Sequence, residues 1–237
     1  GLTKIKDPVC FVLKRNGKSI LYKKDQLLTV FENAVYEDKN KHGDIVEMPF
    51  IPKWLKDPEM QMKDEFGLFP DEESCPENIY NNWVPFDCTT WNLENYQYDQ
   101  SKVDIYLKLL WTLCNEEENT YQFFVKWIAH IFQLPQHKPL VAIIISGEQG
   151  VGKDMALDAL ALIMGKNKRF ESICPEREVW GQFNGQMRDC MLVQLSEIDK
   201  SNTRGAGGMM KSYITGPTIN TNQKFEPACK MKSIHRY

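Results

Sequence analysis

The apolar residues at the start of the chain fall in short runs separated by polar turns. Residues 9–13 and 19–22 are two such runs, and Asn16-Gly17 lies between them. An Asn-Gly pair between apolar runs favours a two-residue β-hairpin turn. Residues 25–31 then predict a short helix, and prolines that recur through residues 48–88 indicate an irregular but ordered connector. The sequence therefore predicts a small α+β region at the start of the chain.

Two longer stretches carry apolar residues at helical spacing. They cover residues 102–113 and 120–133, and an acidic turn at 115–119 joins them. Apolar side chains three and four positions apart share one side of a helix, so the aromatic residues of both stretches are expected in a core between paired helices. Pro135 and Pro139 end the second helix.

Beyond these prolines, the pattern predicts strands on either side of a helix. Residues 140–145 and 190–195 are strand-length apolar runs, and residues 155–164 are rich in Ala and Leu. Two strands joined by a helical crossover form a βαβ unit with parallel strands. We therefore expect an α/β fold with a parallel sheet. The predicted parts are the α+β region over 1–95, the helical pair over 96–135 and the α/β core over 136–237.

Composition narrows the class of protein. The chain has 237 residues and 42% hydrophobic content, which is ordinary for a globular protein. No apolar run is long enough to span a bilayer and no signal peptide is visible. Seven scattered cysteines without a Cys-x-x-Cys pair indicate reduced thiols, not zinc ligands or disulfides. We expect an intracellular protein without a membrane partner, in host cytoplasm or nucleus if it is viral.

The most specific signal is a glycine-rich loop between the predicted strand and helix. Residues 146–155 read Ser-Gly-Glu-Gln-Gly-Val-Gly-Lys-Asp-Met. The spacing is that of a phosphate-binding loop, in which backbone N–H groups surround the phosphates and the lysine reaches the terminal ones. The positive end of the following helix dipole points at the same anion. The residues expected to contact ATP are Gly147, Glu148, Gln149, Gly150, Val151, Gly152, Lys153, Asp154 and Met155.

Asp154 departs from this pattern, which places Ser or Thr after the lysine as a ligand of Mg²⁺. A carboxylate is also a good Mg²⁺ ligand, but it adds negative charge beside anionic phosphates. Three roles for Asp154 therefore stay open. It binds the metal directly, binds it through water, or serves as the acidic first-turn residue that helix N-termini favour.

A second acidic position follows the apolar run at 190–195. Glu197 and Asp199 lie just beyond that run, on the C-terminal side of the lysine loop. In phosphate-loop enzymes an acid at this strand end holds Mg²⁺ through water, and a neighbouring acid polarises the attacking water. With Lys153 they are the candidate catalytic residues, and Glu197 is the second candidate metal ligand. A plain Glu-x-Asp turn is the alternative.

The charge distribution adds a possible polyanion partner. Net charge is −3 overall, but residues 200–237 carry seven Lys or Arg against the single acid Glu226. Such a basic stretch suits nucleic acid, although a solvated basic surface gives the same pattern.

Taken together, the motifs resemble those of the poxvirus-type primase–helicase family, the superfamily III replicative helicases of viruses and phages. The resemblance covers roughly residues 45–237. It rests on the phosphate loop and on Leu195-Ser-Glu-Ile-Asp199, and on further segments upstream and downstream. These are residues 54–58, 69–71, 82–83, 123–133, 180–184, 210–216 and 222–227.

The resemblance implies an AAA+-like ATPase core that assembles as a hexameric ring and moves along DNA, often joined to a primase domain. ATP and Mg²⁺ would be its cofactors. Lys211 and Lys224 would face DNA or a neighbouring subunit's phosphates. Arg204 is a candidate for an arginine acting on a neighbouring subunit, and an ordinary surface arginine fits its position equally well.

The chain departs from the family pattern at two further places. The family often has two adjacent acids where this chain has Ser196-Glu197, and it expects a later strand that ends in a polar sensor of the γ-phosphate. The chain stops at Tyr237, about where that strand should begin. We therefore expect a fragment of a longer protein that lacks the sensor strand.

Three other functions stay open. A small-molecule kinase with a phosphate loop would need a lid rich in arginines, and residues 165–186 offer only Arg169 and Arg177. A nucleotide-binding assembly module would bind ATP without hydrolysing it. A plain DNA-binding module would leave the phosphate loop unexplained.

Overall fold

The computed structural model describes residues 1–237 except 16–17, 93, 95–96, 98 and 197–199; side chains are described outside those positions and outside 200–206. The chain divides into two compact units. Unit 1 comprises Gly1–Asn82 and Asn220–Met231, and unit 2 comprises Trp83–Ile219 and Lys232–Tyr237. The division at residues 95 and 135 stays a prediction from the sequence.

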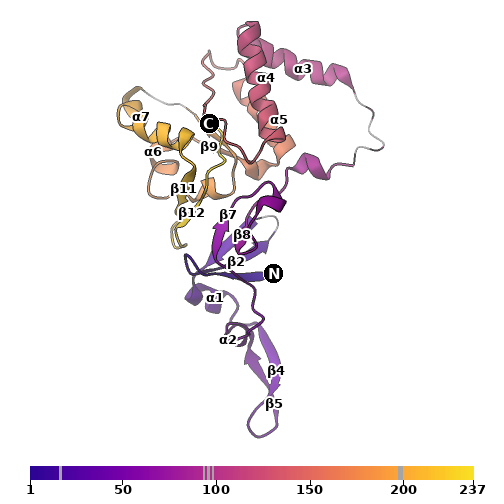
Figure 1. Cartoon of the computed structure of the whole chain (residues 1–237), viewed down its shortest axis with the longest axis vertical. Coiled ribbons are helices and arrows are strands. Elements are labelled where there is room, and N and C mark those ends of the chain that lie inside the picture. Colours follow the sequence, from indigo (N-terminus) through magenta and orange to yellow (C-terminus); the bar gives the residue numbers. More distant parts are fainter. Residues whose placement is uncertain (16–17, 93, 95–96, 98, 197–199) are drawn as a thin grey trace. The chain divides into compact units, whose positions relative to one another are not determined.

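Unit 1 contains a small sheet with two short helices beside it (Figure 1). The strand order is β3-β2-β1-β6, with β1 antiparallel to β2 and parallel to β6. Phe11, Leu27 and Ile51 form a buried cluster that joins β2 to the helices α1 and α2. The sheet strands are β1 (Leu2–Ile5), β2 (Cys10–Arg15), β3 (Lys18–Tyr22) and β6 (Met62–Lys63), and the helices are α1 (Lys24–Val30) and α2 (Phe50–Trp54).

The predicted N-terminal hairpin is confirmed, because β2 and β3 pair antiparallel. Its turn residues 16 and 17 lie outside the described positions. The remaining strands of unit 1 form two pairs, an antiparallel hairpin and a parallel pair. They are β4 (Val35–Lys39) with β5 (Ile45–Pro49), and β7 (Glu65–Gly67) with β8 (Ile79–Asn81), the latter two separated by a 3-10 turn, η1 (Glu72–Ser74).

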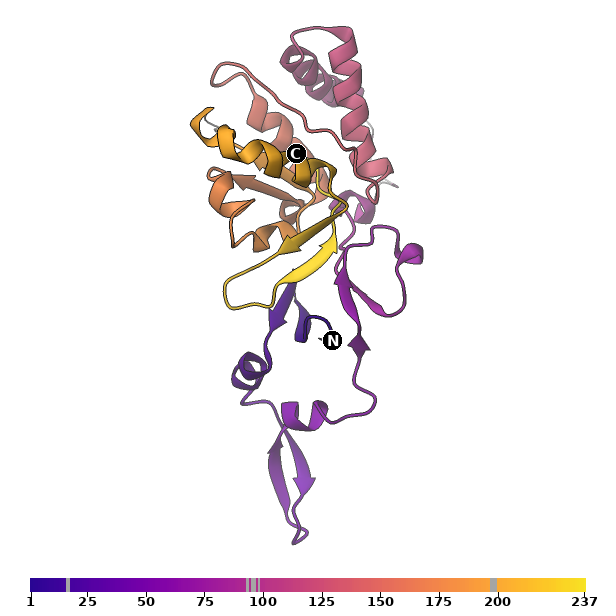
Figure 2. The same cartoon turned by 60° about the vertical axis from the view of Figure 1, so that its left-hand side comes forward.

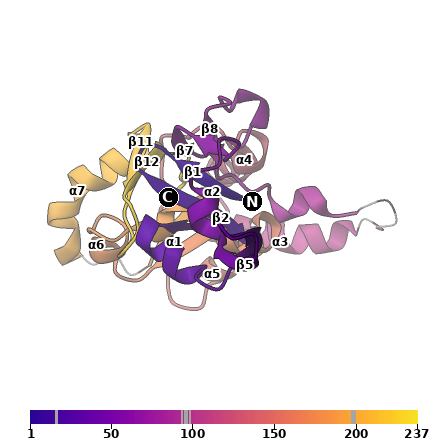
Figure 3. The same cartoon turned by 90° about the horizontal axis from the view of Figure 1, so that it is seen from below.

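Unit 2 contains the helical pair that the sequence predicts. Helix α3 (Gln100–Leu113) packs against both α4 (Glu118–Gln133) and α5 (Lys153–Met164) (Figures 1 and 3). Phe124, Trp127 and Ile131 are the buried residues of α4, so three of its apolar positions lie in the core. Phe123 is exposed, so not every aromatic residue of this helix lies in the core.

The other elements of unit 2 are short strands, helices and 3-10 turns. Strands β9 and β10 pair in parallel, and the sequence did not predict β9. The predicted βαβ unit is a different one, which joins residues 140–145 to 190–195 through the helix at 155–164, and the α/β fold with a phosphate-loop sheet stays a prediction. These other elements of unit 2 are the 3-10 turns η2 (Asp87–Thr90), η3 (Lys166–Lys168) and η4 (Gly185–Arg188), the strands β9 (Arg169–Ser172) and β10 (Leu192–Leu195), and the helices α6 (Pro175–Glu178) and α7 (Lys200–Thr215).

The C-terminal residues lie beside β10. The backbone N–H of Arg236 donates to the carbonyl oxygen of Met191 (2.7 Å), and that of Val193 donates to the carbonyl oxygen of Arg236 (2.8 Å), in a parallel bridge. The N–H of Ile143 then donates to the carbonyl oxygen of Tyr237 (2.8 Å). The backbone neighbours therefore run in the order β9, β10, residues 236–237 and residue 143.

Residues 140–145 differ from the sequence prediction. They have no regular secondary structure, and Ile144 is 85% exposed, although the apolar run predicts a buried strand. Leu140 has a positive φ of 61°, which interrupts an extended backbone at the first residue of the run. The backbone bond of Ile143 to Tyr237 is what remains of the expected strand pairing.

Strands β11 (Thr218–Thr221) and β12 (Cys229–Lys232) form a two-stranded sheet, of which residues 220–231 belong to unit 1 (Figure 2). Thr221, Cys229 and Met231 are its buried side chains within unit 1. All seven cysteines lie in the described part of the chain, and none of them forms a disulfide.

Candidate nucleotide-binding site

The glycine-rich loop ends at the first residue of α5. Gly150 and Gly152 have φ values of +85° and +94°, in a left-handed region that residues with a Cβ rarely adopt. A Cβ on Gly152 would also lie 2.8 Å from Cδ1 of Leu109 on α3. Glycine at these two positions therefore follows from the backbone of the loop and from its close approach to α3.

Lys153 is the first residue of α5, and its side chain folds back over the loop. Its Nζ donates to the carbonyl oxygens of Gly147 (2.8 Å) and Glu148 (2.7 Å). The loop N–H groups, the ammonium and the positive end of a 12-residue helix dipole are thus gathered in one place. This is the arrangement that binds a polyphosphate.

Asp154 is joined to the end of β10. The side-chain Nε2 of Gln194 donates to Oδ1 of Asp154 (3.0 Å) and to Oγ of Ser196 (3.3 Å). Asp154 directly follows Lys153, and Ser196 directly precedes Glu197. The helix start after the lysine loop therefore contacts the end of β10. The contact extends to Ser196, the last described residue before Glu197.

Arg169 on β9 holds this contact from the other side. Its Nε and Nη2 donate to Oε1 of Gln194 (2.9 and 2.5 Å), while Nη1 pairs with Asp158 of α5. Nη2 also pairs with Oε2 of Glu171 (3.1 Å). The Arg169 side chain is 10% exposed. One guanidinium thus ties α5, β9 and β10 together through charge-assisted bonds.

Strand register explains why these groups meet. In the parallel pair, Gln194 is opposite Glu171, and residues two positions apart on a strand share a face. Arg169, Glu171, Gln194 and Ser196 therefore project from the same face. The bonds to Asp154 and Asp158 show that this face is the one covered by α5.

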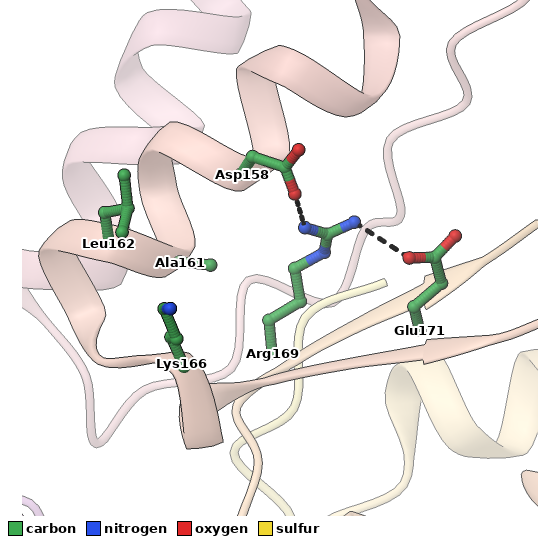
Figure 4. A pocket seen from close by; sticks show the side chains of 6 residues that line it. All are labelled: Asp158, Ala161, Leu162, Lys166, Arg169 and Glu171. Carbon is green, nitrogen blue, oxygen red and sulfur yellow. Dashed lines mark hydrogen bonds and ion pairs between the residues drawn. The ribbon is translucent and has the colours of Figure 1, made fainter.

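A shallow pocket lies beside the site, along α5 and β9 (Figure 4). The dashed lines in Figure 4 join Arg169 to Asp158 and to Glu171, so ion pairs occupy part of its wall. Leu162, also on the wall, is 60% exposed. The pocket is lined by Asp158, Ala161, Leu162, Lys166, Arg169 and Glu171, and therefore contains no residue of the glycine loop.

The other predicted site residues are distributed differently. Glu197 and Asp199 lie outside the described residues, and so does the side chain of Arg204. Lys211 is exposed on α7 in unit 2, and Lys224 is exposed in the β11–β12 loop in unit 1. Phe225 follows Lys224 and is 68% exposed, with the lysine Nζ 4.9 Å from its ring centroid.

Sequence reasoning missed Gln194, Ser196 and Glu171 as parts of this site, and considered Arg169 only as a possible lid residue. The alternation of polar Gln194 and Ser196 with apolar Val193 and Leu195 is the signal that could have identified them, because it places two polar side chains on one face of a strand.

Two absences concern the described part of the chain. There, no three His, Cys, Asp or Glu side chains come together in a way that could hold a metal ion. Likewise, none of the helices in those residues is both long and apolar enough to cross a bilayer.

Comparison with known proteins supports the fold. Residues 144–237 match a family of unknown function (DUF5906). No curated protein sequence matches the chain. Among solved structures, the apo C-terminal region of NrS-1 (305-718) is similar with a TM-score of 0.70 and 20% identity, over 99% of this chain and 52% of that one.

Two further structures of the same NrS-1 region, both described as the A form, agree. One has a TM-score of 0.71 and 20% identity, covering 99% of this chain and 52% of its own. The other has a TM-score of 0.64 and 22% identity, covering 96% and 50%. The chain therefore shares a fold with the NrS-1 C-terminal region and spans about half the length of those structures.

Proposed function

We propose that the chain binds ATP with Mg²⁺ at residues 147–155 and belongs to a ring-forming, ATP-dependent DNA helicase of viral or phage replication. The observation that carries the nucleotide site is the position of Lys153, whose ammonium lies over the glycine loop at the N-terminus of α5. The fold that supports it is an α/β core in which residues 236–237 lie between β10 and the segment before the loop.

In this proposal the loop and its lysine do the binding. The ammonium of Lys153 exchanges the carbonyl oxygens of Gly147 and Glu148 for phosphate oxygens, while loop N–H groups donate to the others. Bound Mg²⁺ would supply neutralisation of the phosphate charge that develops during transfer. Phosphoryl transfer needs mainly positioning and electrostatic stabilisation, which these groups provide without covalent participation.

The acidic end of β10 would orient the attacking water. Glu197 is assigned to the metal and water, and Asp199 is a second acid near it. Asp154 and Glu197 are the protein's proposed metal ligands. The bonds from Gln194 to Asp154 and Ser196 support this assignment, because they bring the residue before Glu197 next to the lysine loop.

DNA contact is assigned to Lys211 and Lys224. Both side chains are exposed, and Lys224 is followed by the exposed ring of Phe225. A basic group beside an exposed aromatic ring suits single-stranded DNA, because the cation neutralises phosphate while the ring stacks on a base. A hexameric ring, and a primase domain in the full protein, complete the proposal.

Replacement of Lys153 by Ala tests the nucleotide site. We expect equilibrium binding of ATP to be lost while the protein stays folded. Lys166→Ala, in the 3-10 turn η3 that follows α5, should bind ATP like wild type. Titration of a fluorescent ATP analogue gives both affinities, and circular dichroism checks folding. Undiminished ATP affinity in Lys153→Ala would exclude the loop as the site.

The activity needs its own measurement. A helicase should release phosphate faster with single-stranded DNA and separate a DNA duplex. ATP binding and ring formation without phosphate release would indicate an assembly module. Phosphate transfer to a nucleoside monophosphate without stimulation by DNA would indicate a kinase.

A further inference from the structure

Asp154 and Ser196 share one hydrogen-bond donor. The carboxylate Oδ1 of Asp154 and the hydroxyl Oγ of Ser196 lie 3.0 and 3.3 Å from the same nitrogen, Nε2 of Gln194. The distance between the two oxygens therefore cannot exceed the sum of these two hydrogen-bond lengths. They come from opposite sides of the site, since Asp154 is in the first turn of α5 and Ser196 follows β10.

The orientation of Gln194 is fixed by its other neighbour. Arg169 directs two N–H groups at Oε1 of Gln194, and a guanidinium has no acceptor. The amide oxygen must therefore face Arg169, and the amide nitrogen must face Asp154 and Ser196. This leaves the acceptor oxygens of Asp154 and Ser196 held together by a donor that carries no charge.

Ser196 is held from a second direction. Its hydroxyl donates to Oε1 of Glu171 (2.9 Å), so the hydroxyl hydrogen points towards β9. A hydroxyl oxygen has two lone pairs, and the bond from Gln194 uses one. Ser196 therefore keeps one lone pair for a metal ion, while its hydrogen is directed at Glu171.

Phosphate-loop enzymes hold their metal between two such groups. One is the Ser or Thr hydroxyl after the loop lysine, and the other is an acid at the end of the neighbouring strand. Here the carboxylate follows the lysine, at Asp154, and the hydroxyl stands at the strand end, at Ser196. The same pair of groups is present with its two positions exchanged.

We propose that this exchange forms the metal site of the nucleotide pocket: Asp154 binds Mg²⁺ directly, Ser196 provides the opposing hydroxyl oxygen, and Gln194 positions both. The inference rests on the proposed nucleotide binding. Mg²⁺ is usually held by one or two carboxylates with substrate phosphates and water. Asp154 and Ser196 would therefore act beside Glu197, the second carboxylate of the proposed function. The metal is expected to bind together with the phosphates of the nucleotide.

The test is a reciprocal exchange. Four proteins are compared: wild type, Asp154→Ser, Ser196→Asp, and the double variant Asp154→Ser with Ser196→Asp. Binding of ADP is measured once in EDTA and once with Mn²⁺, and bound Mn²⁺ is measured by electron paramagnetic resonance. Asp25→Ser, which removes the first-turn acid of α1 in unit 1, is the matched control.

The affinity of each variant for ADP in EDTA is the reference for its own metal-dependent gain. The metal-dependent gain in ADP affinity and the bound Mn²⁺ signal should fall about tenfold or more in Asp154→Ser, and return to within about threefold of wild type in the double variant. Asp25→Ser should keep the full gain. Because the new carboxylate at position 196 would face Glu171, the double variant is also made with Glu171→Gln.

A full metal-dependent gain in Asp154→Ser would overturn the inference. The inference would also be overturned if the double variant, with and without Glu171→Gln, showed no larger metal-dependent gain in ADP affinity than Asp154→Ser. These results leave ADP binding in EDTA intact, and with it the proposed nucleotide site. Failure of wild type to bind ADP under either condition would instead overturn the proposed function, and the metal site with it.

Discussion

The backbone N–H of Ile143 donates to the carbonyl oxygen of Tyr237 at 2.8 Å. Ile143 precedes the glycine loop and Tyr237 is the last residue of the chain, so this bond joins the approach to the loop to the segment beside β10. The side chains of Gln194 and Asp154 make the second connection, on the other side of the loop. Together these bonds place the lysine loop and the end of β10 in one site.

The two loop glycines should differ in their tolerance of a side chain. We expect Gly150→Ala to lower the free energy of unfolding by about 1–2 kcal/mol, because its φ of +85° strains any residue with a Cβ. Gly152→Ala should cost more, since Leu109 must also move. Urea denaturation measures both. Leu109→Ala destabilises the protein by itself. In that background, however, Gly152→Ala should lower the free energy of unfolding no more than Gly150→Ala does.

Gly207→Ala is the control for this experiment. Gly207 lies within α7, and a Cβ at this position would have no heavy atom within 4 Å, so alanine should be neutral or stabilising by up to about 1 kcal/mol. Equal stability of Gly150→Ala and Gly207→Ala would show that the loop does not hold the left-handed conformation.

Arg169 should contribute more to stability than a surface arginine. Arg169→Met leaves the Gln194 amide oxygen without its two donors and removes both ion pairs, so we expect a loss of about 1–3 kcal/mol in the free energy of unfolding. Arg177→Met is the control, because Arg177 is 75% exposed and pairs with its neighbour Glu178. Guanidinium denaturation of both variants compares them. Equal losses would contradict a specific role for Arg169.

His235 should make the protein sensitive to acid. Burial is the main cause that lowers the pKa of His235 to about 4. The positive charges of Lys138 and Arg236 lower this pKa as well, while the hydrogen bond to the carbonyl of Met187 raises it. Between pH 6.5 and 4 the unfolded chain therefore binds a proton that the folded chain does not. The free energy of unfolding should fall as pH is lowered through this window, by up to about 3 kcal/mol.

Chemical denaturation at pH 7, 6 and 5 measures this effect. His235→Gln should be less stable at pH 7 but lose less stability between pH 7 and 5 than wild type. His42→Gln, at an exposed position between β4 and β5, should follow the wild-type profile. An unchanged slope in His235→Gln would assign the acid sensitivity to other groups.

The exposed lysines should affect DNA binding through charge. We expect Lys211→Gln and Lys224→Gln each to weaken binding of single-stranded DNA and to lower the slope of log affinity against log salt by about 0.7, as for one lost phosphate contact. Fluorescence anisotropy at several salt concentrations measures the slope. Lys126→Gln, an exposed position on α4, should leave it unchanged. The same slope in all four proteins would exclude both lysines from the DNA surface.

The sequence predicts local elements best where the pattern is long. The helices over 102–113 and 120–133 are confirmed within two residues at each end, because many turns of apolar spacing support them. Strand β9 was missed, since its four residues contain one apolar side chain and depend on pairing with β10. The apolar run at 140–145 predicted a strand that the structure does not have. Ile144 is exposed, and the segment is not a regular strand.

The glycine loop, its lysine and its place at the start of a helix were determined by the sequence alone, because left-handed backbone angles and helix capping depend on consecutive residues. Only the tertiary structure decided that Asp154 meets Gln194 and Ser196, and that Arg169 fixes their orientation. Residues that far apart meet only when α5 packs on the paired strands β9 and β10. The partner of Asp154 is therefore set by strand register and helix packing, which no local pattern encodes.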